Sequence, residues 1–251
     1  MSTQAIRQIV LLWVMWSIVI VGYMHIAPMR YAPQRPDDSL VWTADWTNNQ
    51  PYLLEPFLNE QVAWDSEFYL SIATVGYDDP DVQLVEEGNT AYSMSYAFFP
   101  FYPYLMKVVR LPFVGLGLSP IAASTAAGLA ISLLGTLAAM LALADIIRDK
   151  SDEKRQVRTA FMLLIFPSSL FFATVYTEGL FVGLAFCSLA LMRRDRLIAA
   201  AVLAAFATWT RTIGGVLIIP LAMSWFLAYR AASARSQSAG RYARRFDPAW
   251  Q

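Results

Sequence analysis

Long apolar blocks separated by short polar segments dominate the chain, and they predict membrane helices. Residues 9–27 contain no Asp, Glu, Lys or Arg, and they match the roughly 20 residues that one crossing needs. Residues 119–147 form a second clean block. The first block is long and ends at Pro28 and Arg30 without a small-x-small cleavage site. We therefore expect an uncleaved anchor rather than a cleavable signal peptide.

Two further apolar blocks are too long for one crossing each, and both carry a charge in the middle. As a single helix, residues 159–192 would be about 51 Å long, whereas the hydrocarbon core is about 30 Å thick. Glu178 interrupts this block, and Arg211 interrupts residues 197–229. A charge at the middle of the bilayer costs about 2.5–3.5 kcal/mol on insertion scales. Each block therefore predicts two crossings with a turn at the charge.

These blocks predict an all-α polytopic membrane protein with both termini in the cytoplasm. The expected spans are residues 9–27, 119–147, 159–175, 177–192, 197–210 and 213–229. This orientation leaves 14 of the 19 Lys and Arg residues on the inner side, as the positive-inside rule favours, and a crossing at 98–112 would reverse the distribution. Residues 1–230 then form one transmembrane domain with an external loop and juxtamembrane helices at 28–118, and 231–251 form a mobile cytoplasmic tail.

Composition supports this class and excludes others. The chain is 57% hydrophobic and 15% charged, whereas soluble domains are about 25% charged. A formal net charge of zero gives no bulk attraction to nucleic acid. We find no phosphate-binding glycine loop and no zinc-ligand spacing, so the sequence specifies no cofactor and leaves only a divalent cation open. Asp78, Asp79 and Asp81 offer oxygen ligands for a divalent cation, but their spacing lacks a complete calcium-loop pattern and favours a solvated turn.

The predicted orientation gathers three polar features on the extracytoplasmic side. They are the acidic loop, the turn at Tyr176–Glu178 and the turn at Arg211. Polar residues that interrupt membrane helices typically line a cavity. We therefore expect a site at this face.

Asp65 and Glu67 are the candidate catalytic acids. They follow Trp64 at the start of a predicted short amphipathic helix, residues 65–75, lying on the membrane. A carboxylate beside aromatic residues at a membrane surface is less well solvated, which raises its pKa and suits a general base. The alternative, that Asp65 is one of many acidic loop residues, has equal weight on this pattern alone.

Three other features offer substrate contacts. Glu178 is an acid within an apolar block, which indicates a functional role unless it stabilises a helix end. Arg211 precedes Gly214-Gly215, which suits phosphate recognition, unless the arginine only sets topology by reaching the interface. The aromatic segment 96–105 is either an interfacial belt or a wall for a lipid chain or sugar.

Four stretches resemble, in order, the motifs of the PIG-V family, the second mannosyltransferase of GPI-anchor assembly, and its prokaryotic relatives. The matching residues are Trp64, Asp65, Tyr69, Ile72, Ala73, Gly76 and Tyr77, then Phe98, Phe99, Pro100 and Pro103, then Pro167, Phe171, Tyr176, Thr177 and Glu178, and finally Ala207, Thr208, Arg211 and Gly214. The chain departs at Ala63, where relatives often have His, and at Thr212-Ile213, where they often have Ser-Asn. It is also shorter than its relatives, which indicates a short or truncated member.

The resemblance implies a GT-C-like helix bundle and a hexosyltransferase, mannosyltransferase-like and inverting. Its donor would be a polyprenyl- or dolichyl-phosphate sugar, and its acceptor a lipid, glycan or protein on the extracytoplasmic side. In this reading Asp65 is the base, assisted by Glu67. The substrate-binding candidates are Trp64, Tyr77, Phe99, Pro100, Tyr176, Glu178 and Arg211. We expect a location in a bacterial plasma membrane, or in the endoplasmic reticulum of a eukaryote. The alternative is a non-catalytic membrane subunit or lipid-binding scaffold of the same fold.

Overall fold

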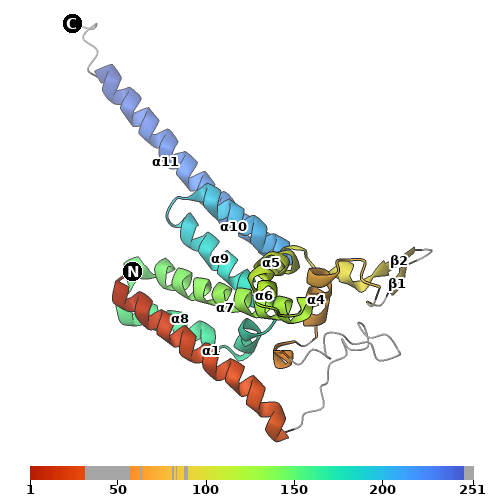
Figure 1. The fold of residues 1–251 in the computed structure, drawn as a ribbon. Coiled ribbons are helices and arrows are strands. Elements are labelled where there is room, and N and C mark those ends of the chain that lie inside the picture. The colour runs from red at the N-terminus through yellow and green to blue at the C-terminus, as the bar shows by residue number, and fades with distance from the viewer. Residues whose placement is uncertain (32–56, 63, 81, 83, 88–89, 246–251) are drawn as a thin grey trace.

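The described part of the molecule is built almost entirely of helices, as the pattern of apolar blocks predicts (Figure 1). The computed structural model describes residues 1–31, 57–62, 64–80, 82, 84–87 and 90–245. In this part of the chain the only strands are β1 (Leu84–Glu87) and β2 (Thr90–Ser93), which pair antiparallel with Leu84 opposite Ser93. The prediction of an all-α protein is therefore confirmed.

Three helical segments are long and apolar enough to cross a membrane. They are residues Thr3–Ala27 of helix α1 (Thr3–Tyr31), helix α7 (Pro120–Ile146), and Thr212–Ala231, which joins η5 (Thr212–Leu217) to the start of α11 (Ile218–Arg245). A fourth candidate is bent by 82° and consists of α8 (Glu153–Leu164) and η4 (Pro167–Ala173). These lengths identify a membrane protein, while the number of crossings and their sidedness stay predictions.

Two shorter apolar helices complete the bundle, and each has one terminus at a break that the sequence predicts. They are α9 (Glu178–Met192) and α10 (Leu197–Thr210). Helix α9 starts at Glu178, and α10 ends where Arg211 takes up an extended backbone with φ −152°. The tail predicted to be mobile from residue 231 continues α11 as a helix as far as Arg245, and α11 projects away from the other helices (Figure 1). Residues 246–251 lie outside the described part of the chain.

Helices α7 and α9 pack backbone to backbone, and glycines make this close approach possible. A Cβ on Gly179 would lie 2.2 Å from the backbone oxygen of Ser132, and one on Gly183 would lie 2.5 Å from that of Gly135. Gly179 and Gly183 are four residues apart, so both lie on one face of α9. Small residues at this spacing let membrane helices pack backbone to backbone.

Short helices cover one end of the bundle. They are η1 (Asn59–Gln61), α4 (Ser66–Thr74), η2 (Met94–Ala97), α5 (Phe101–Val109) and α6 (Leu111–Gly115). Arg110, which lies between α5 and α6, connects these helices to α4 and α7. Its Nη1 donates to the Ala73 oxygen of α4 at 2.9 Å and to Ser124 Oγ of α7 at 3.3 Å. The helix predicted at 65–75 is present as α4, but its residues 66–73 are all buried. It is therefore a packed element of the bundle rather than an amphipathic helix lying on the membrane.

The opposite end of the bundle is held by ion pairs. Arg194 contacts Asp145 at 2.6 Å, and Arg193 contacts Asp149 at 3.3 Å. These pairs join the end of α7 to the turn between α9 and α10. Met1 lines a cavity together with Asp145 and Arg194, so the start of α1 lies at the same end. The bundle thus has two polar ends separated by apolar helices.

Candidate active site

A cavity of about 300 Å³ opens at the end of the bundle that the short helices cover. Four segments that are far apart in the sequence form its wall: the start of α4, the segment between η2 and α5, the start of α9, and the junction of α10 with η5. The lining residues are Asp65, Tyr69, Ala97, Phe98, Phe99, Thr177, Thr210, Arg211, Thr212 and Ile213. The fold therefore brings the three polar features and the aromatic segment together.

Asp65 reaches the cavity from the N-terminal end of α4. It occupies the capping position there, and its carboxylate makes no capping hydrogen bond to the helix. The preceding residue, Trp64, has a left-handed backbone with φ 47°, which is uncommon for a side chain of this size and turns the chain sharply. The backbone N–H of Asp65 donates to the Tyr176 hydroxyl at 3.1 Å. The exposed carboxylate is thus anchored through its backbone.

Arg211 and Glu178, the two charges within apolar sequence, form an ion pair. Nη1 of Arg211 contacts Oε1 of Glu178 and also donates to Thr177 Oγ1 at 3.1 Å. The Arg211 side chain remains 42% exposed and that of Glu178 26%. Among the residues that the structure describes, Nε and Nη2 of Arg211 have no hydrogen-bond partner. Two donor groups of a positioned guanidinium are therefore available at the cavity.

Gly214 shapes the Arg211 turn through its packing against α10. A Cβ at this position would lie 2.5 Å from the backbone carbon of Ala207, so only glycine lets η5 fold back against α10. Its N–H donates to the Arg211 oxygen at 2.9 Å. At Gly215 a Cβ would meet nothing within 4 Å. Of the two glycines, Gly214 therefore permits a close backbone approach, and the group that it approaches is the neighbouring helix α10.

The segment before α9 is fixed by contacts from three directions. The N–H of Val175 donates to the Gln61 oxygen at 2.9 Å, and Ser132 Oγ of α7 donates to the Tyr176 oxygen at 2.7 Å. The Tyr176 ring also packs against Phe171, with ring centroids 5.0 Å apart. Thr177 and Glu178 follow directly, so their positions relative to Arg211 are set by this network.

Tyr69 is a cavity residue that the site prediction did not include, although it belongs to the first motif. Its ring meets Phe98, Tyr102 and Tyr176 edge to face, at centroid distances of 5.3, 5.2 and 6.2 Å. Burial raises the pKa of the Tyr69 phenol, while a hydrogen bond with Thr177 opposes this shift. The phenol stays protonated at neutral pH and is a neutral hydrogen-bonding group in the cavity wall. Its place four residues after Asp65, one helical turn away, is the signal that identifies it.

The remaining predicted site residues differ in how they are placed relative to the cavity lining. Tyr176 and Glu178 contact lining residues directly, as described above. Tyr77 supports the wall from behind: its hydroxyl donates to the Phe98 oxygen at 2.9 Å, and burial raises the pKa of Tyr77 to about 12. Pro100 caps α5 next to Phe99, which does line the cavity. Trp64 and Glu67 are outside the lining, Trp64 being exposed and Glu67 only 1% exposed within α4.

The acidic cluster after α4 is engaged in local hydrogen bonds. Asp79 is buried and accepts from Ser71 Oγ at 2.6 Å, so it does not belong to a solvated turn. Asp78 accepts from the Tyr96 hydroxyl at 2.9 Å, and this contact raises the pKa of Tyr96. Asp81 lies outside the described residues. Within the described ranges, no three or more His, Cys, Asp or Glu side chains form a group that could hold a metal ion.

Comparison with known proteins identifies the family. No curated protein and no solved structure matches the chain. The family described as Mannosyltransferase (PIG-V) matches residues 6–230, which include every segment of the cavity wall. This match covers most of the 251 residues and agrees with the four motifs. The chain therefore belongs to the PIG-V mannosyltransferase family of membrane proteins.

Proposed function

We propose that the protein transfers a hexose, mannose in keeping with its family, from a polyprenyl- or dolichyl-phosphate donor to an acceptor hydroxyl. The observation that carries this proposal is that Asp65 and Arg211 line the same cavity. A carboxylate suits proton removal from the acceptor, and a guanidinium suits a phosphate leaving group. The GT-C fold implied by the resemblance uses an acidic residue of the first external loop as base, which corresponds to Asp65.

The reaction is a single displacement at the anomeric carbon. The acceptor hydroxyl attacks C1 of the donor sugar while the Asp65 carboxylate takes the hydroxyl proton. The bond between C1 and the phosphate oxygen breaks, and its electron pair leaves with the lipid phosphate. Attack from the face opposite the leaving group inverts the anomeric centre. Asp65 is exposed and lines the cavity, so an acceptor bound there would meet its carboxylate.

Arg211 stabilises the charge that develops on the departing phosphate. Glu178 and Thr177 hold one Nη atom, so the remaining N–H groups keep a fixed direction. Because Glu178 compensates the positive charge, the contribution of Arg211 is directional hydrogen bonding more than bulk attraction. Preorganised donors of this kind gain most in a site with little water.

The aromatic wall suits the apolar part of the donor. Phe98 and Phe99 line the cavity, and the Phe98 ring stacks on Phe68 at 4.6 Å between centroids. In our proposal this surface contacts the first isoprene units of the donor lipid or the face of the sugar. The site then lies on the extracytoplasmic side of a multi-pass protein in a bacterial plasma membrane. The opposite end of the bundle, which carries Arg193, Arg194 and Arg196 and is called the cationic end below, faces the cytoplasm in this proposal.

The test is replacement of Asp65 by Asn in the full chain. Purified protein is given a radiolabelled polyprenyl-phosphate mannose and an acceptor lipid extract, and the transfer rate is measured. Loss of a general base lowers the rate by about 10²–10⁴-fold. Asp78→Asn is the matched control, since Asp78 is an exposed acid of the same loop outside the cavity lining, and we expect it to keep its activity.

Two outcomes would contradict the proposal in different ways. Normal turnover by Asp65→Asn would show that the base is another group. A wild-type protein that binds the donor but neither transfers nor hydrolyses it would support the non-catalytic scaffold instead.

A further inference from the structure

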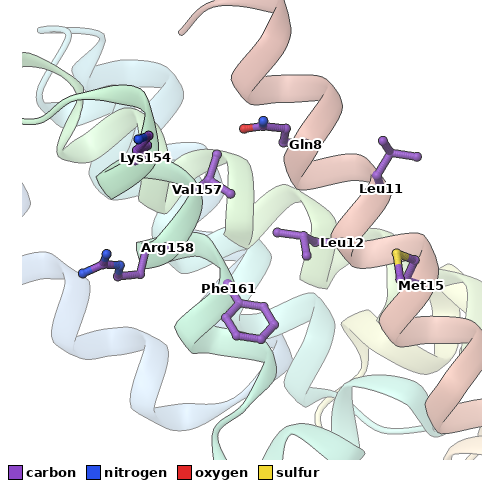
Figure 2. A pocket seen from close by; sticks show the side chains of 8 residues that line it. All are labelled: Gln8, Leu11, Leu12, Met15, Lys154, Val157, Arg158 and Phe161. Atoms are coloured by element: carbon purple, nitrogen blue, oxygen red, sulfur yellow. The ribbon is translucent and has the colours of Figure 1, made fainter.

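A second cavity lies far from the candidate active site, in a groove between α1 and α8. Its volume is about 540 Å³, and it is lined by Gln8, Leu11, Leu12, Met15, Lys154, Val157, Arg158 and Phe161. Figure 2 shows these side chains on the two neighbouring helices, with Gln8 and Leu12 directed from α1 toward α8. None of these residues belongs to the site described above.

The groove changes from polar to apolar along its length. On each helix the lining residues recur at spacings of three or four and span eight positions, 8–15 on α1 and 154–161 on α8, so they form one stripe about 10 Å long. The polar residues Gln8 and Lys154 start the two stripes, and the apolar residues Met15 and Phe161 end them. Both helices begin near the cationic end of the bundle, so the polar end of the groove lies toward the membrane surface and the apolar end deeper.

The polar end carries two positive charges, those of Lys154 and Arg158. Lys154 and Arg158 are one turn apart on α8 and are exposed, and Arg158 extends outward from the helix (Figure 2). In the described part of the chain neither has an ion-pair partner, in contrast to Arg193 and Arg194 at the same end. Two cations beside an apolar groove are complementary to a molecule with an anionic head and a hydrocarbon tail.

We propose that this groove binds one anionic glycerophospholipid, with its phosphate at Lys154 and Arg158 and an acyl chain along Leu12, Val157 and Phe161. Charge complementarity supports an anionic head, and basic pockets between membrane helices are known to hold such headgroups. The bound lipid bridges α1 to α8. This bridge matters for α1, because only 6% of its apolar window is buried inside the protein. The proposal does not depend on the catalytic assignment.

The test compares lipid retention by charge variants of the full chain. Protein purified in a neutral detergent is titrated with palmitoyl-oleoyl phosphatidylglycerol, and bound lipid is counted by native mass spectrometry. Each Lys or Arg near an anionic headgroup is worth about a fivefold change in affinity, so K154Q/R158Q should weaken binding about 25-fold. The control R7Q/R155Q removes two cations from the same two helices outside the groove, and we expect less than about a threefold change from it.

Two further binding measurements distinguish an anionic lipid from a neutral lipid and from free phosphate. Phosphatidylcholine with the same chains should bind at least about tenfold more weakly, and inorganic phosphate at the same concentration should not displace phosphatidylglycerol. Equal binding of the two lipids, equal loss in both double variants, or displacement by phosphate alone would overturn the proposal.

A second variant tests the same proposal if K154Q/R158Q impairs insertion of the protein into the membrane. Val157→Trp fills the groove and leaves both cations in place, and it should lower phosphatidylglycerol binding at least about tenfold by excluding the acyl chain. Met162→Trp is its control, because Met162 is an exposed residue of α8 outside the lining. Unchanged binding by Val157→Trp would place the lipid elsewhere.

Discussion

At the scale of single residues, the main finding is that the two charges in apolar sequence stabilise each other. Glu178 alone, or Arg211 alone, would be costly to keep among apolar residues. Paired, each supplies the partner that the other needs, and Thr177 adds a third contact. The pair also explains how a guanidinium can be held at the mouth of a cavity with some of its donors still available.

A double-mutant cycle tests this coupling. Removing one partner leaves the other partly buried without its counter-charge, so Arg211→Ala or Glu178→Ala should each cost about 1 kcal/mol, a modest value because both side chains are partly exposed. The double variant should lose less than the sum of the two. Unfolding of the purified variants in detergent, followed by circular dichroism, measures the three changes, and strict additivity would contradict a direct pair.

At the scale of elements, the site depends on how closely α7 and α9 pack. Glu178 is the first residue of α9, and Gly179 follows it directly against Ser132 of α7. Ser132 also holds the Tyr176 carbonyl. The helix contact and the placement of the ion pair are therefore parts of one arrangement.

The helix contact can be tested by adding one methyl group. Gly179→Ala would bring a Cβ to 2.2 Å from a backbone oxygen, so the helices must separate. We expect a stability loss of about 1–3 kcal/mol and a lower transfer rate, because Glu178 moves with α9. Gly22→Ala is the control: nothing lies within 4 Å of its Cβ, and alanine favours a helix interior by about 0.5–1 kcal/mol. Thermal unfolding in detergent compares the two, and an undisturbed Gly179→Ala would contradict the close packing.

At the scale of the whole molecule, the candidate site lies at one end of the bundle. A cationic cluster, formed by Lys150, Arg193, Arg194 and Arg196, lies at the other. Asp65 and Arg211 lie at one end, and the pairs Arg193–Asp149 and Arg194–Asp145 at the other. If the bundle spans the membrane as the positive-inside rule predicts, these ends face different compartments.

Cysteine labelling in intact cells measures this sidedness. In a Cys187→Ser background, single cysteines replace exposed residues at each end: Phe99 and Thr212 near the cavity, Lys150 and Arg196 at the cationic cluster. A membrane-impermeant maleimide should label Phe99→Cys and Thr212→Cys from outside, and the other two only after permeabilisation. Labelling of Phe99→Cys or Thr212→Cys from the cytosol alone would contradict an extracytoplasmic location of the site.

The amino-acid sequence by itself determined the features that depend on nearby residues in the chain, namely where helices form and where they end. Apolar blocks of helical length specify the membrane helices, and a charge or extended residue within a block marks where a helix must end, as at Glu178 and Arg211. Four ordered motifs also sufficed to indicate the family that the comparison then showed.

Only the tertiary structure decided which of these residues meet. The ion pair between Glu178 and Arg211, the inclusion of Tyr69 in the cavity wall and the burial of Glu67 depend on segments that are distant in the sequence. The physical reason is that periodicity describes which face of a helix is apolar, whereas pairing depends on how helices cross. One such crossing, that of α7 with α9, depends on a backbone contact that glycine alone permits.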